Sequence, residues 1–390
     1  MNRLTLGSLF DGSGGFPLAG ALNKINAIWA SEVEPYPIAV TKERFPQMKH
    51  LGDVMKINGT EIEPVDIITF GSPCQDMSIA GNRAGMKHEG KGDDTTTRSG
   101  LFYEAIRIIR EMREKTHGRH PTFAVWENVP GAFSSNKGED FRCVLEEFCK
   151  ITDEGVSIPR PDKGKWKSAG EIVGCGYSVA WRQLDAQYWG VPQRRKRIYL
   201  VADFAGRRAG EILFERESVQ GHSTPGRETK QAITTNDAGS TGGGSGVGCL
   251  NHIFDPQGSG TDLEQNVVCY DARGNGDGVQ CPTLTGDHES RITDYTGVVV
   301  YRNPKIGEYA ADGTVPTMAA RDFKSKPPRK YIIRRLTPRE CCRLQGFPDW
   351  WENGVDGRDS ARYKMWGNGI ALPCAAFVLE GIATKGGEEE

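Results

Sequence analysis

Two residues able to act on a substrate follow strand-like apolar runs in this chain. Cys74 lies in "ITFGSPCQDMS", and Pro73 fixes the backbone just before the thiol, which favours its display over its burial. The thiol could be a redox group, a metal ligand, a buried structural residue (the commonest case) or a nucleophile. Glu127, in "WENVPG", ends the next run, where Val125 and Trp126 could raise its pKa and make it a proton donor. A displayed thiol and a carboxyl at neighbouring strand ends favour nucleophilic catalysis.

Two basic clusters interrupt an otherwise neutral chain of net charge −2. Arg195 and Arg197, in "PQRRKRIY", alternate with Lys196, so both could face one side as an oxyanion or phosphate clamp. Residues 324–343 carry eight Lys or Arg against one Glu. Because phosphate neutralisation needs only a local patch, these clusters favour a polyanionic partner.

A glycine-rich turn, "LFDGSGGF", joins the first apolar run to a helix-like stretch through Gly12, Gly14 and Gly15. Glycine permits positive φ and close approach of a ligand to the backbone. The turn is not the dinucleotide fingerprint, because Pro17 stands where its third glycine would fall. This spacing favours a nucleoside ligand without a pyrophosphate.

Two acidic residues follow the next expected strands. Glu32 stands 20 residues after Gly12, where nucleotide-binding α/β sheets place an acid that accepts hydrogen bonds from ribose hydroxyls. Asp53 falls where a third strand should end, within reach of an adenine amino group. Each signal is weak alone, but their order along the chain predicts a site for an adenosine-type ligand.

The first 203 residues alternate short apolar runs with helix-like stretches, as in "GLFYEAIRIIREMREK", where apolar residues recur every three to four positions. This alternation predicts an α/β fold with a parallel sheet and helices on both faces. The expected strands are Leu4–Leu9, Ile28–Ser31, Asp66–Phe70, Thr122–Trp126, Tyr177–Leu184 and Ile198–Ala202.

The chain changes character after Phe204. Residues 221–248 are rich in Gly, Ser and Thr, and short β-like runs such as "NVVCYDA" and "TGVVVYR" follow. A weak repeat aligns Thr283 with Thr317, 34 positions apart. We expect a catalytic, cofactor-binding domain over residues 1–203, completed by 354–390, and a smaller β-rich domain over 204–353.

Composition limits the other classes of protein. No apolar stretch is long enough to span a bilayer, and the start of the chain lacks the layout of a signal peptide, so we expect a cytoplasmic protein. The ten cysteines and seven histidines form no ligand pattern, so we expect no metal. The residues from Thr152 to Glu171 form a polar insertion to which the sequence assigns no role.

Eight segments, spread over both ends and the middle of the chain, resemble the sequence blocks of bacterial and phage DNA cytosine-5-methyltransferases in the order typical of that family. They are "FDGSGGF", "SEVEPYP", "GDV", "GSPCQDMS", "WENVPG", "QRRKRIY", "RRLTPRECCRLQGFPDWW" and "GNGIALPCAAFVL". The stretch from about residue 204 to 333 lacks a family block, as expected for a variable target-recognition domain. The resemblance implies a Rossmann-like methyltransferase sheet that uses S-adenosylmethionine.

The resemblance also assigns roles to residues. The Cys74 thiolate would add to carbon 6 of a cytosine flipped out of duplex DNA, so that carbon 5 takes the methyl group. Glu127 would contact ring nitrogen 3, and Arg197, with Arg195, would stabilise the base. The implied cofactor-binding residues are Phe10, Gly12, Gly14, Gly15, Glu32, Val33, Asp53, Pro73, Asn368 and Gly369. Gln75, Ser78 and Arg98 are expected to contact DNA.

Two other functions are weighed against this one. An RNA cytosine-5-methyltransferase of the same superfamily usually lacks a large recognition domain and carries a Cys-Phe-Thr signature, which is absent here. A nicotinamide-dependent oxidoreductase is disfavoured by the glycine spacing. We expect a monomer acting on double-stranded DNA, with no membrane or metal partner. The sequence leaves open whether a cognate restriction endonuclease exists or the enzyme is an orphan of phage type.

Overall fold

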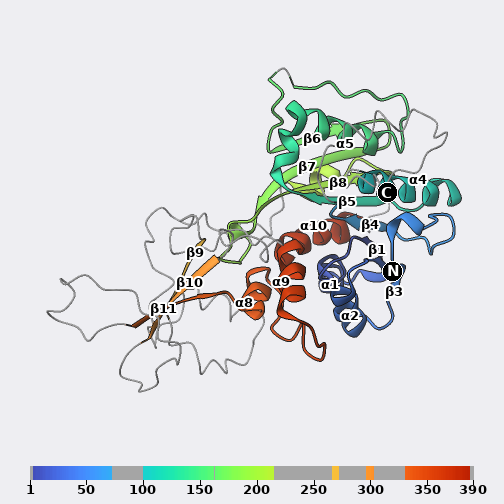
Figure 1. The fold of residues 1–390 in the computed structure, drawn as a ribbon. Coiled ribbons are helices and arrows are strands. Elements are labelled where there is room, and N and C mark those ends of the chain that lie inside the picture. The colour runs from blue at the N-terminus through green and yellow to red at the C-terminus, as the bar shows by residue number, and fades with distance from the viewer. Residues whose placement is uncertain are drawn as a thin grey trace, which may run out of the picture. The chain divides into compact units, whose positions relative to one another are not determined.

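The computed structural model describes residues 3–72, 100–161, 163–214, 266–271, 296–302 and 330–386 (Figure 1). The described residues belong to two compact units. The first lies within Met1–Asp185, Lys196–Gly221 and Cys374–Glu390, and the second within Ala186–Arg195 and His222–Pro373.

The first unit is built on an eight-stranded sheet of order β3-β2-β1-β4-β5-β8-β7-β6. Its strands are β1 (Thr5–Leu9), β2 (Asn26–Ser31), β3 (Lys49–His50), β4 (Ile67–Phe70), β5 (Phe123–Asn128), β6 (Ala169–Val173), β7 (Ser178–Asp185) and β8 (Lys196–Asp203). Its α-helices are α1 (Gly15–Leu22), α2 (Pro35–Arg44), α4 (Gly100–Lys115), α5 (Glu139–Cys149), α6 (Ala209–Leu213) and most of α10 (Leu372–Lys385). Short 3₁₀ turns are η1 (Val54–Lys56), η2 (Pro130–Phe133) and η3 (Ser135–Gly138).

All six expected strands are present, with ends shifted by one or two residues. Strands that are covered on both faces of a sheet consist of nearly continuous apolar residues, which is why these apolar runs form strands. All four residues of β4 and all six of β5 are buried. The strand expected before Asp53 is β3, which is only two residues long. Strand β6 is additional, and it alternates exposed and half-buried residues at the edge of the sheet.

The prediction of a parallel sheet is confirmed for five strands of the eight, but the pairings of β6, β7 and β8 are antiparallel. Strands β3, β2, β1, β4 and β5 are parallel, whereas β8 is antiparallel to both β5 and β7, and β6 is antiparallel to β7. The reason lies in the connections. A parallel crossover needs a dozen or more residues, but residues 186–195 alone join β7 to β8 and residues 174–177 join β6 to β7.

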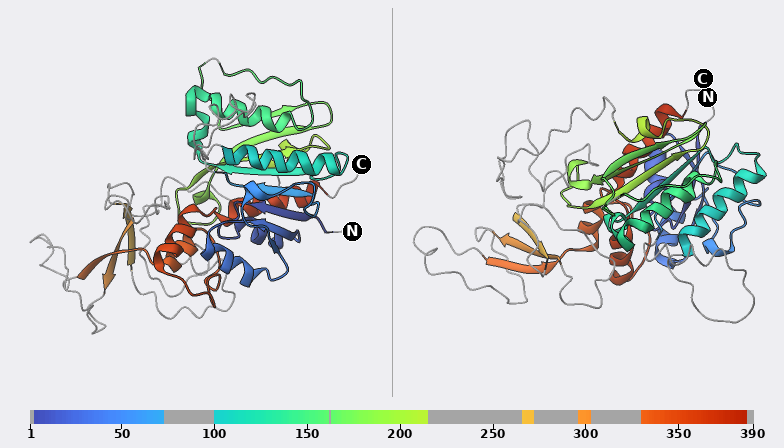
Figure 2. Two further views of the ribbon diagram at one scale, coloured as in Figure 1. Left: turned by 45° about the vertical axis from the view of Figure 1, so that its right-hand side comes forward. Right: turned by 90° about the horizontal axis from the view of Figure 1, so that it is seen from above.

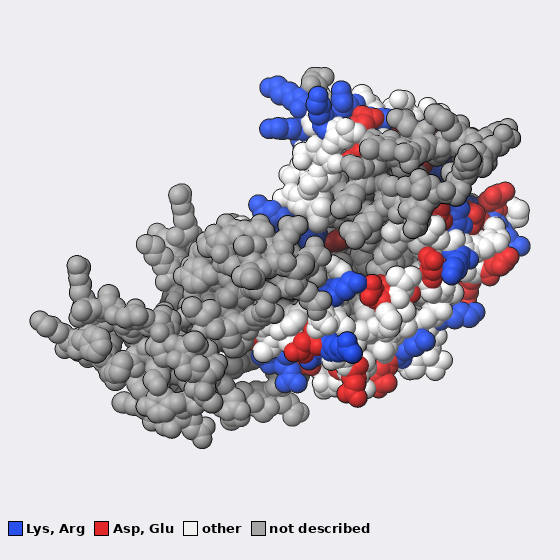
Figure 3. Space-filling model, in the orientation of Figure 1, with Lys and Arg blue, Asp and Glu red and all other residues white. Residues whose placement is uncertain are grey.

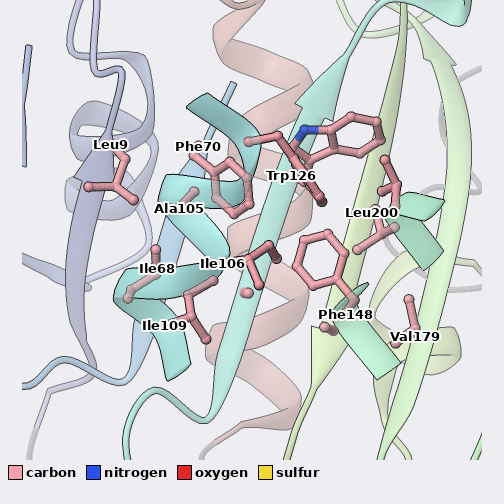
Figure 4. Packing of buried hydrophobic residues seen from close by; sticks show 14 of the residues in the cluster. Leu9, Ile68, Phe70, Ala105, Ile106, Ile109, Trp126, Phe148, Val179 and Leu200 are labelled. Atoms are coloured by element: carbon pink, nitrogen blue, oxygen red, sulfur yellow. The ribbon is translucent and has the colours of Figure 1, made fainter. Parts of the chain in front are cut away.

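Helices cover both faces of this sheet, as predicted (Figure 2). The expected helix over Gly100–Lys115 is α4, and its apolar side packs with α5 on one face, where Phe102, Ile106 and Phe148 meet side chains from β4, β5 and β8 (Figure 4). Helix α10 lies behind the opposite face in the same view. The sheet is thereby held rigid from both sides, which fixes the edge where the strands end.

The second unit contains a three-stranded antiparallel sheet of order β11-β10-β9. Strands β9 (Asn266–Asp271) and β10 (Thr296–Arg302) are the two β-like runs read from the sequence, but β11 (Lys330–Arg335) lies in the basic cluster and was not expected as a strand. Residues 221–248 and the repeat around Thr283 and Thr317 lie outside the described residues.

Two helices follow β11 in the second unit, α8 (Pro338–Leu344) and α9 (Asp359–Asn368). The start of α8 is a capping box. The Thr337 hydroxyl accepts a hydrogen bond from the Glu340 backbone N–H, and the Glu340 carboxylate accepts one from the Thr337 N–H. Among the described residues no single helix is long and apolar enough to cross a membrane, and only α9 and α10 taken together, bent by 45°, reach that length and composition.

Strand β1 can be tested through Gly7, because a Cβ at this position would overlap the buried Trp29 ring. The ring cannot move freely, since its Nε1 donates a hydrogen bond to the Glu63 carbonyl at 2.9 Å. We expect Gly7→Ala to lower the free energy of unfolding by about 1–3 kcal/mol, measured by urea denaturation. Gly155→Ala, in an exposed turn with room for a methyl group, is the matched control and should change stability little.

Candidate active site

The candidate site residues that the structure describes in the first unit lie where strands β1, β2, β3 and β5 end. In open α/β sheets ligands bind at this edge. Gly12 follows β1, Glu32 follows β2 and Asp53 follows β3, while Glu127 is the penultimate residue of β5. Cys74, four residues after β4, lies outside the described residues, as do Pro73, Gln75, Ser78 and Arg98.

The glycine turn after β1 has the backbone conformation for which glycine was expected. Gly12 and Gly14 have φ of 54° and 78°, and Gly14 caps the start of α1. The Glu32 carboxylate holds this turn in place by accepting a hydrogen bond from the Gly12 N–H at 2.8 Å. Its other oxygen accepts from the N–H groups of Val33 and Glu34 at 2.7 and 2.9 Å. The predicted ribose acceptor therefore also fixes the cofactor turn.

The surroundings of the turn fit an adenosine-type cofactor. A Cβ added at Gly12 would meet nothing closer than the Phe10 carbonyl at 3.9 Å, so space beside the turn is open. Val33 offers an apolar side chain that is 62% exposed. The Asp53 side chain accepts from the Met55 N–H at 3.0 Å, which caps η1 and fixes this carboxylate at the same edge. Acceptors beside an apolar surface suit ribose hydroxyls, an amino group and a purine ring.

Asp11, inside the glycine turn, is a site residue that the sequence reasoning missed, although it stands in the quoted segment "FDGSGGF". It is buried, and its Oδ1 accepts a hydrogen bond from the Ser8 hydroxyl at 2.7 Å. Its Oδ2 has no hydrogen-bond partner among the described residues. Burial raises the pKa of Asp11 to about 7; the Ser8 hydrogen bond opposes this rise and the charge of Glu32 adds to it.

An ion pair joins two predicted catalytic residues. The Arg197 guanidinium Nε lies 3.1 Å from Oε1 of Glu127, and both side chains are nearly buried, with 13% and 10% exposed. The register explains the contact, because Glu127 on β5 pairs with Tyr199 on β8 and Arg197 lies two positions along on the same face. Arg197 thus places a cation beside the Glu127 carboxylate at the end of β5.

The chain leaving β4 is held against β5 just before Cys74. The Asn128 side-chain amide donates to the Ser72 carbonyl at 2.9 Å, and the Trp126 indole N–H donates to the Ser72 hydroxyl at 3.1 Å. Ser72 is itself buried. At Gly71 a Cβ would lie 3.2 Å from the Glu127 carboxylate, so glycine lets this carboxylate approach the β4 exit closely.

Arg195 belongs to the second unit and has different partners from Arg197. Its buried guanidinium donates to the carbonyls of Gly367 and Gly369, at the end of α9. Gln345, which is also fully buried, holds the same turn. Its side-chain amide donates to the Trp366 carbonyl at 2.8 Å, and its backbone carbonyl accepts a hydrogen bond from the Leu372 N–H at 2.8 Å. Arg195 and Gln345 together fix the segment that carries Asn368 and Gly369.

Comparison with known proteins places this arrangement in a family. The sequence profile described as "C-5 cytosine-specific DNA methylase" matches residues 4–152 and 169–384. The chain therefore belongs to the C-5 cytosine-specific DNA methylases, and its class of activity is DNA cytosine-5-methylation. This membership favours neither an RNA methyltransferase nor a nicotinamide-dependent oxidoreductase.

Individual relatives are described as methyltransferases, one of them as acting on adenine rather than cytosine. A protein of Escherichia phage P1 described as a DNA N-6-adenine-methyltransferase is 29% identical over 98% of this chain, which spans 61% of that protein's length. The type II methyltransferase M.HpaII of Haemophilus parainfluenzae is 27% identical over 98% of this chain and 90% of its own length.

Solved structures confirm the expected fold class. The S. pombe Dnmt2 methyltransferase matches with a TM-score of 0.55 and 18% identity, covering 97% of this chain and 98% of that one. A putative DNA modification methyltransferase from an E. coli prophage matches with a TM-score of 0.52 and 17% identity, covering 99% of this chain and 100% of that one. At these identities the likeness is one of fold, and the fold is that of a methyltransferase sheet.

Asp11 predicts a specific pH dependence of stability. Because burial raises the pKa of Asp11 from the ordinary value of 3.8 to about 7 in the folded state, the contribution of Asp11 to the stability of the wild-type protein should fall as pH rises from about 4 to 7 and change no further above that range. Asp11→Asn removes this titration. The free energy of unfolding of the variant should therefore exceed that of the wild-type protein by a margin that grows over this pH range, to at most roughly 4 kcal/mol. Denaturation between pH 4 and 9 measures it, with the exposed Asp153→Asn as control; a difference independent of pH would contradict the assignment.

The turn after α9 predicts a cost for losing the Gln345 amide. Gln345→Leu leaves the Trp366 carbonyl without its donor in a buried setting, which should cost about 1–3 kcal/mol. Hydrogen exchange of the amides in residues 366–372 should speed up. The control variant Gln47→Leu makes the same change at an exposed position and should leave these exchange rates unchanged. Unchanged exchange rates in Gln345→Leu would contradict the prediction.

Proposed function

We propose that this protein transfers a methyl group from S-adenosylmethionine to carbon 5 of a cytosine in duplex DNA, through a transient covalent bond to Cys74. The observation that carries the proposal is the Glu127–Arg197 ion pair at the end of β5, next to a β4 exit that Asn128 and Trp126 hold two residues before Cys74. A carboxylate, a guanidinium and the approach to a thiol converge on one strand edge.

Each residue has a defined part in this proposal. The Cys74 thiolate adds to carbon 6 of the ring, which moves electron density to carbon 5 and makes it a nucleophile. Glu127 lies at ring nitrogen 3, and Arg197 orients this carboxylate and offsets charge that develops on the base. Once carbon 5 has taken the methyl group, loss of its proton to a base and departure of the thiolate restore the aromatic ring. Arg195 supports the site through the turn of Asn368 and Gly369.

The cofactor would be held by the first unit's glycine turn and the two acids that follow β2 and β3. S-adenosylmethionine supplies an electrophilic methyl group on a sulfonium when bound. Glu32 would accept hydrogen bonds from the ribose, Asp53 from the adenine amino group, and Phe10 and Val33 would offer apolar contacts. Gly12, Gly14 and Gly15 let a ligand approach the backbone, while Pro73 and the Asn368–Gly369 turn complete the proposed set.

The substrate would be a flipped base, because carbon 6 cannot be reached inside a stacked duplex. We assign Gln75, Ser78 and Arg98 to contacts with DNA near the extruded cytosine. Residues 204–353 would form the target-recognition domain, since the stretch from about 204 to 333 lacks a family block and the range contains the antiparallel β9–β11 sheet. We further propose a monomer in solution, with a cognate endonuclease as a partner where one is encoded nearby.

The covalent step can be tested with a mechanism-based trap. Fluorine at carbon 5 replaces the hydrogen that must leave, so a duplex containing 5-fluorocytosine at the target should form a denaturation-resistant complex with the wild-type protein when S-adenosylmethionine is present. Cys74→Ala should form none and should lack methyl transfer, while both its DNA and its cofactor binding persist.

Bisulfite sequencing of DNA from cells expressing the chain would identify the target. Nucleoside analysis should then find 5-methylcytosine rather than N6-methyladenine. Methyl transfer at the wild-type rate by Cys74→Ala would refute the covalent mechanism. Methylated adenine as the sole product would refute the proposed substrate.

A further inference from the structure

The polar insertion after α5 is a part of this chain that the family pattern does not include. The family profile matches residues 4–152 and resumes at 169, so residues 153–168 fall between its two segments. The insertion is nevertheless packed onto the first unit. The Ile158 N–H donates to the Glu146 carboxylate at 3.0 Å, and the Trp166 indole N–H donates to the Gly138 carbonyl at 2.8 Å. These hydrogen bonds fix the insertion on the surface of the first unit.

Aromatic packing orients the end of the insertion. The Trp166 ring stacks edge-on with Phe141 and Trp181, at centroid distances of 5.4 and 5.9 Å. Lys163, Lys165 and Lys167 are all exposed, whereas the intervening Gly164 and Trp166 are half-buried. The alternation turns the three lysines, here called the insertion lysines, away from the packed indole and toward solvent.

A fourth lysine lies beside them. Gly138 and Gly164 pack so closely that a Cβ on Gly164 would lie 2.7 Å from the Lys137 carbonyl. Lys137 is exposed and belongs to η3, which follows β5 and η2. The insertion lysines and Lys137 therefore share one surface, although they lie more than 20 positions apart in the sequence.

Strand register places this surface at the active-site edge of the sheet. The Ser168 carbonyl accepts from the Gln183 N–H at 2.7 Å, near the end of β7. The last residue of β7, Asp185, pairs with Lys196 at the start of β8, and Ile198 pairs with Asn128 at the end of β5. The insertion lysines thus enter β6 from the same edge at which Glu127 and Arg197 meet.

Charge on the surface is segregated. Nearby cations within the fold are neutralised: Arg142 pairs with Glu139 and Glu146, and Lys150 pairs with Glu146. None of the insertion lysines forms an ion pair with a carboxylate among the residues that the structure describes. Figure 3 shows Lys and Arg side chains gathered at the end of the first unit where β6 and α5 lie.

We propose that the insertion lysines, with Lys137, bind backbone phosphates of duplex DNA outside the target site. The inference rests on the proposed DNA substrate and extends its footprint beyond the flipped cytosine. A duplex held at the active-site edge carries a regular line of phosphates past the flanking surface, and exposed lysines gain affinity by releasing counterions from them. Such contacts add length-dependent affinity without reading sequence.

The test is a charge-neutralised triple variant, Lys163→Gln, Lys165→Gln and Lys167→Gln. Its matched control is Lys24→Gln, Lys49→Gln and Lys115→Gln, three exposed lysines near the starts of β2, β3 and β5, at the opposite edge of the sheet. Binding is measured against salt concentration on duplexes of about 12 and about 30 base pairs. Each phosphate contact contributes about 0.9 to the slope of log K against log salt.

For the long duplex we expect the insertion variant to lose about 2–3 from the magnitude of this slope and roughly tenfold or more in affinity at ~0.1 M salt. The short duplex and the control variant should change little, and S-adenosylmethionine affinity should stay the same. An unchanged slope, an equal loss in the control variant, or tighter binding of duplex RNA than of DNA by this surface would overturn the proposal.

The two proposals fail separately. Duplex binding is measured without methyl transfer, so a protein that binds long DNA through these lysines but makes no 5-methylcytosine would refute the proposed function alone. Cytosine methylation by the wild-type protein, together with an unchanged salt slope in the insertion variant, would refute this inference alone.

Discussion

The Glu127–Arg197 ion pair depends on the direction of a single strand. Arg197 stands near the start of β8 and Glu127 near the end of β5, and only an antiparallel pairing brings a strand start and a strand end to the same edge. A parallel β8 would have carried Arg197 to the far side of the sheet. The mixed topology is thus what supplies a guanidinium to a carboxylate at the active-site edge.

Burial strengthens the attraction between these two charges and raises the cost of losing either of them. Two charges that are nearly withdrawn from water attract strongly, but either one alone would be left uncompensated at a cost of several kcal/mol. The surrounding hydrogen bonds restrict the geometry further, since the side chains of Trp126 and Asn128 both donate to Ser72. One strand end, Trp126 to Asn128, therefore carries the acid and also holds the chain that leaves β4.

The Glu32 carboxylate also has two roles, at the strand ends where the cofactor is proposed to bind. Glu32 accepts hydrogen bonds from three backbone N–H groups, one of them in the glycine turn 20 residues earlier. The same carboxylate that would meet a ribose also sets the shape of the turn that would meet the rest of the ligand. Burial raises the pKa of Asp11, inside the same turn, to about 7, and the charge of Glu32 adds to this rise.

Sequence alone determined the strands of the parallel half, helix α4, the capping box of α8, the glycine turn and the acids at successive strand ends, because these follow from local periodicity, backbone sterics and residue type. It did not reveal that β6, β7 and β8 run antiparallel, that β11 is a strand within a basic cluster, or that Arg195 and Arg197 serve different partners. Nor did local pattern single out Asp11, Gln345 or the insertion lysines. Their environments arise from chain segments far apart in the sequence, and only the packed tertiary structure sets burial, pairing direction and the distance between charges.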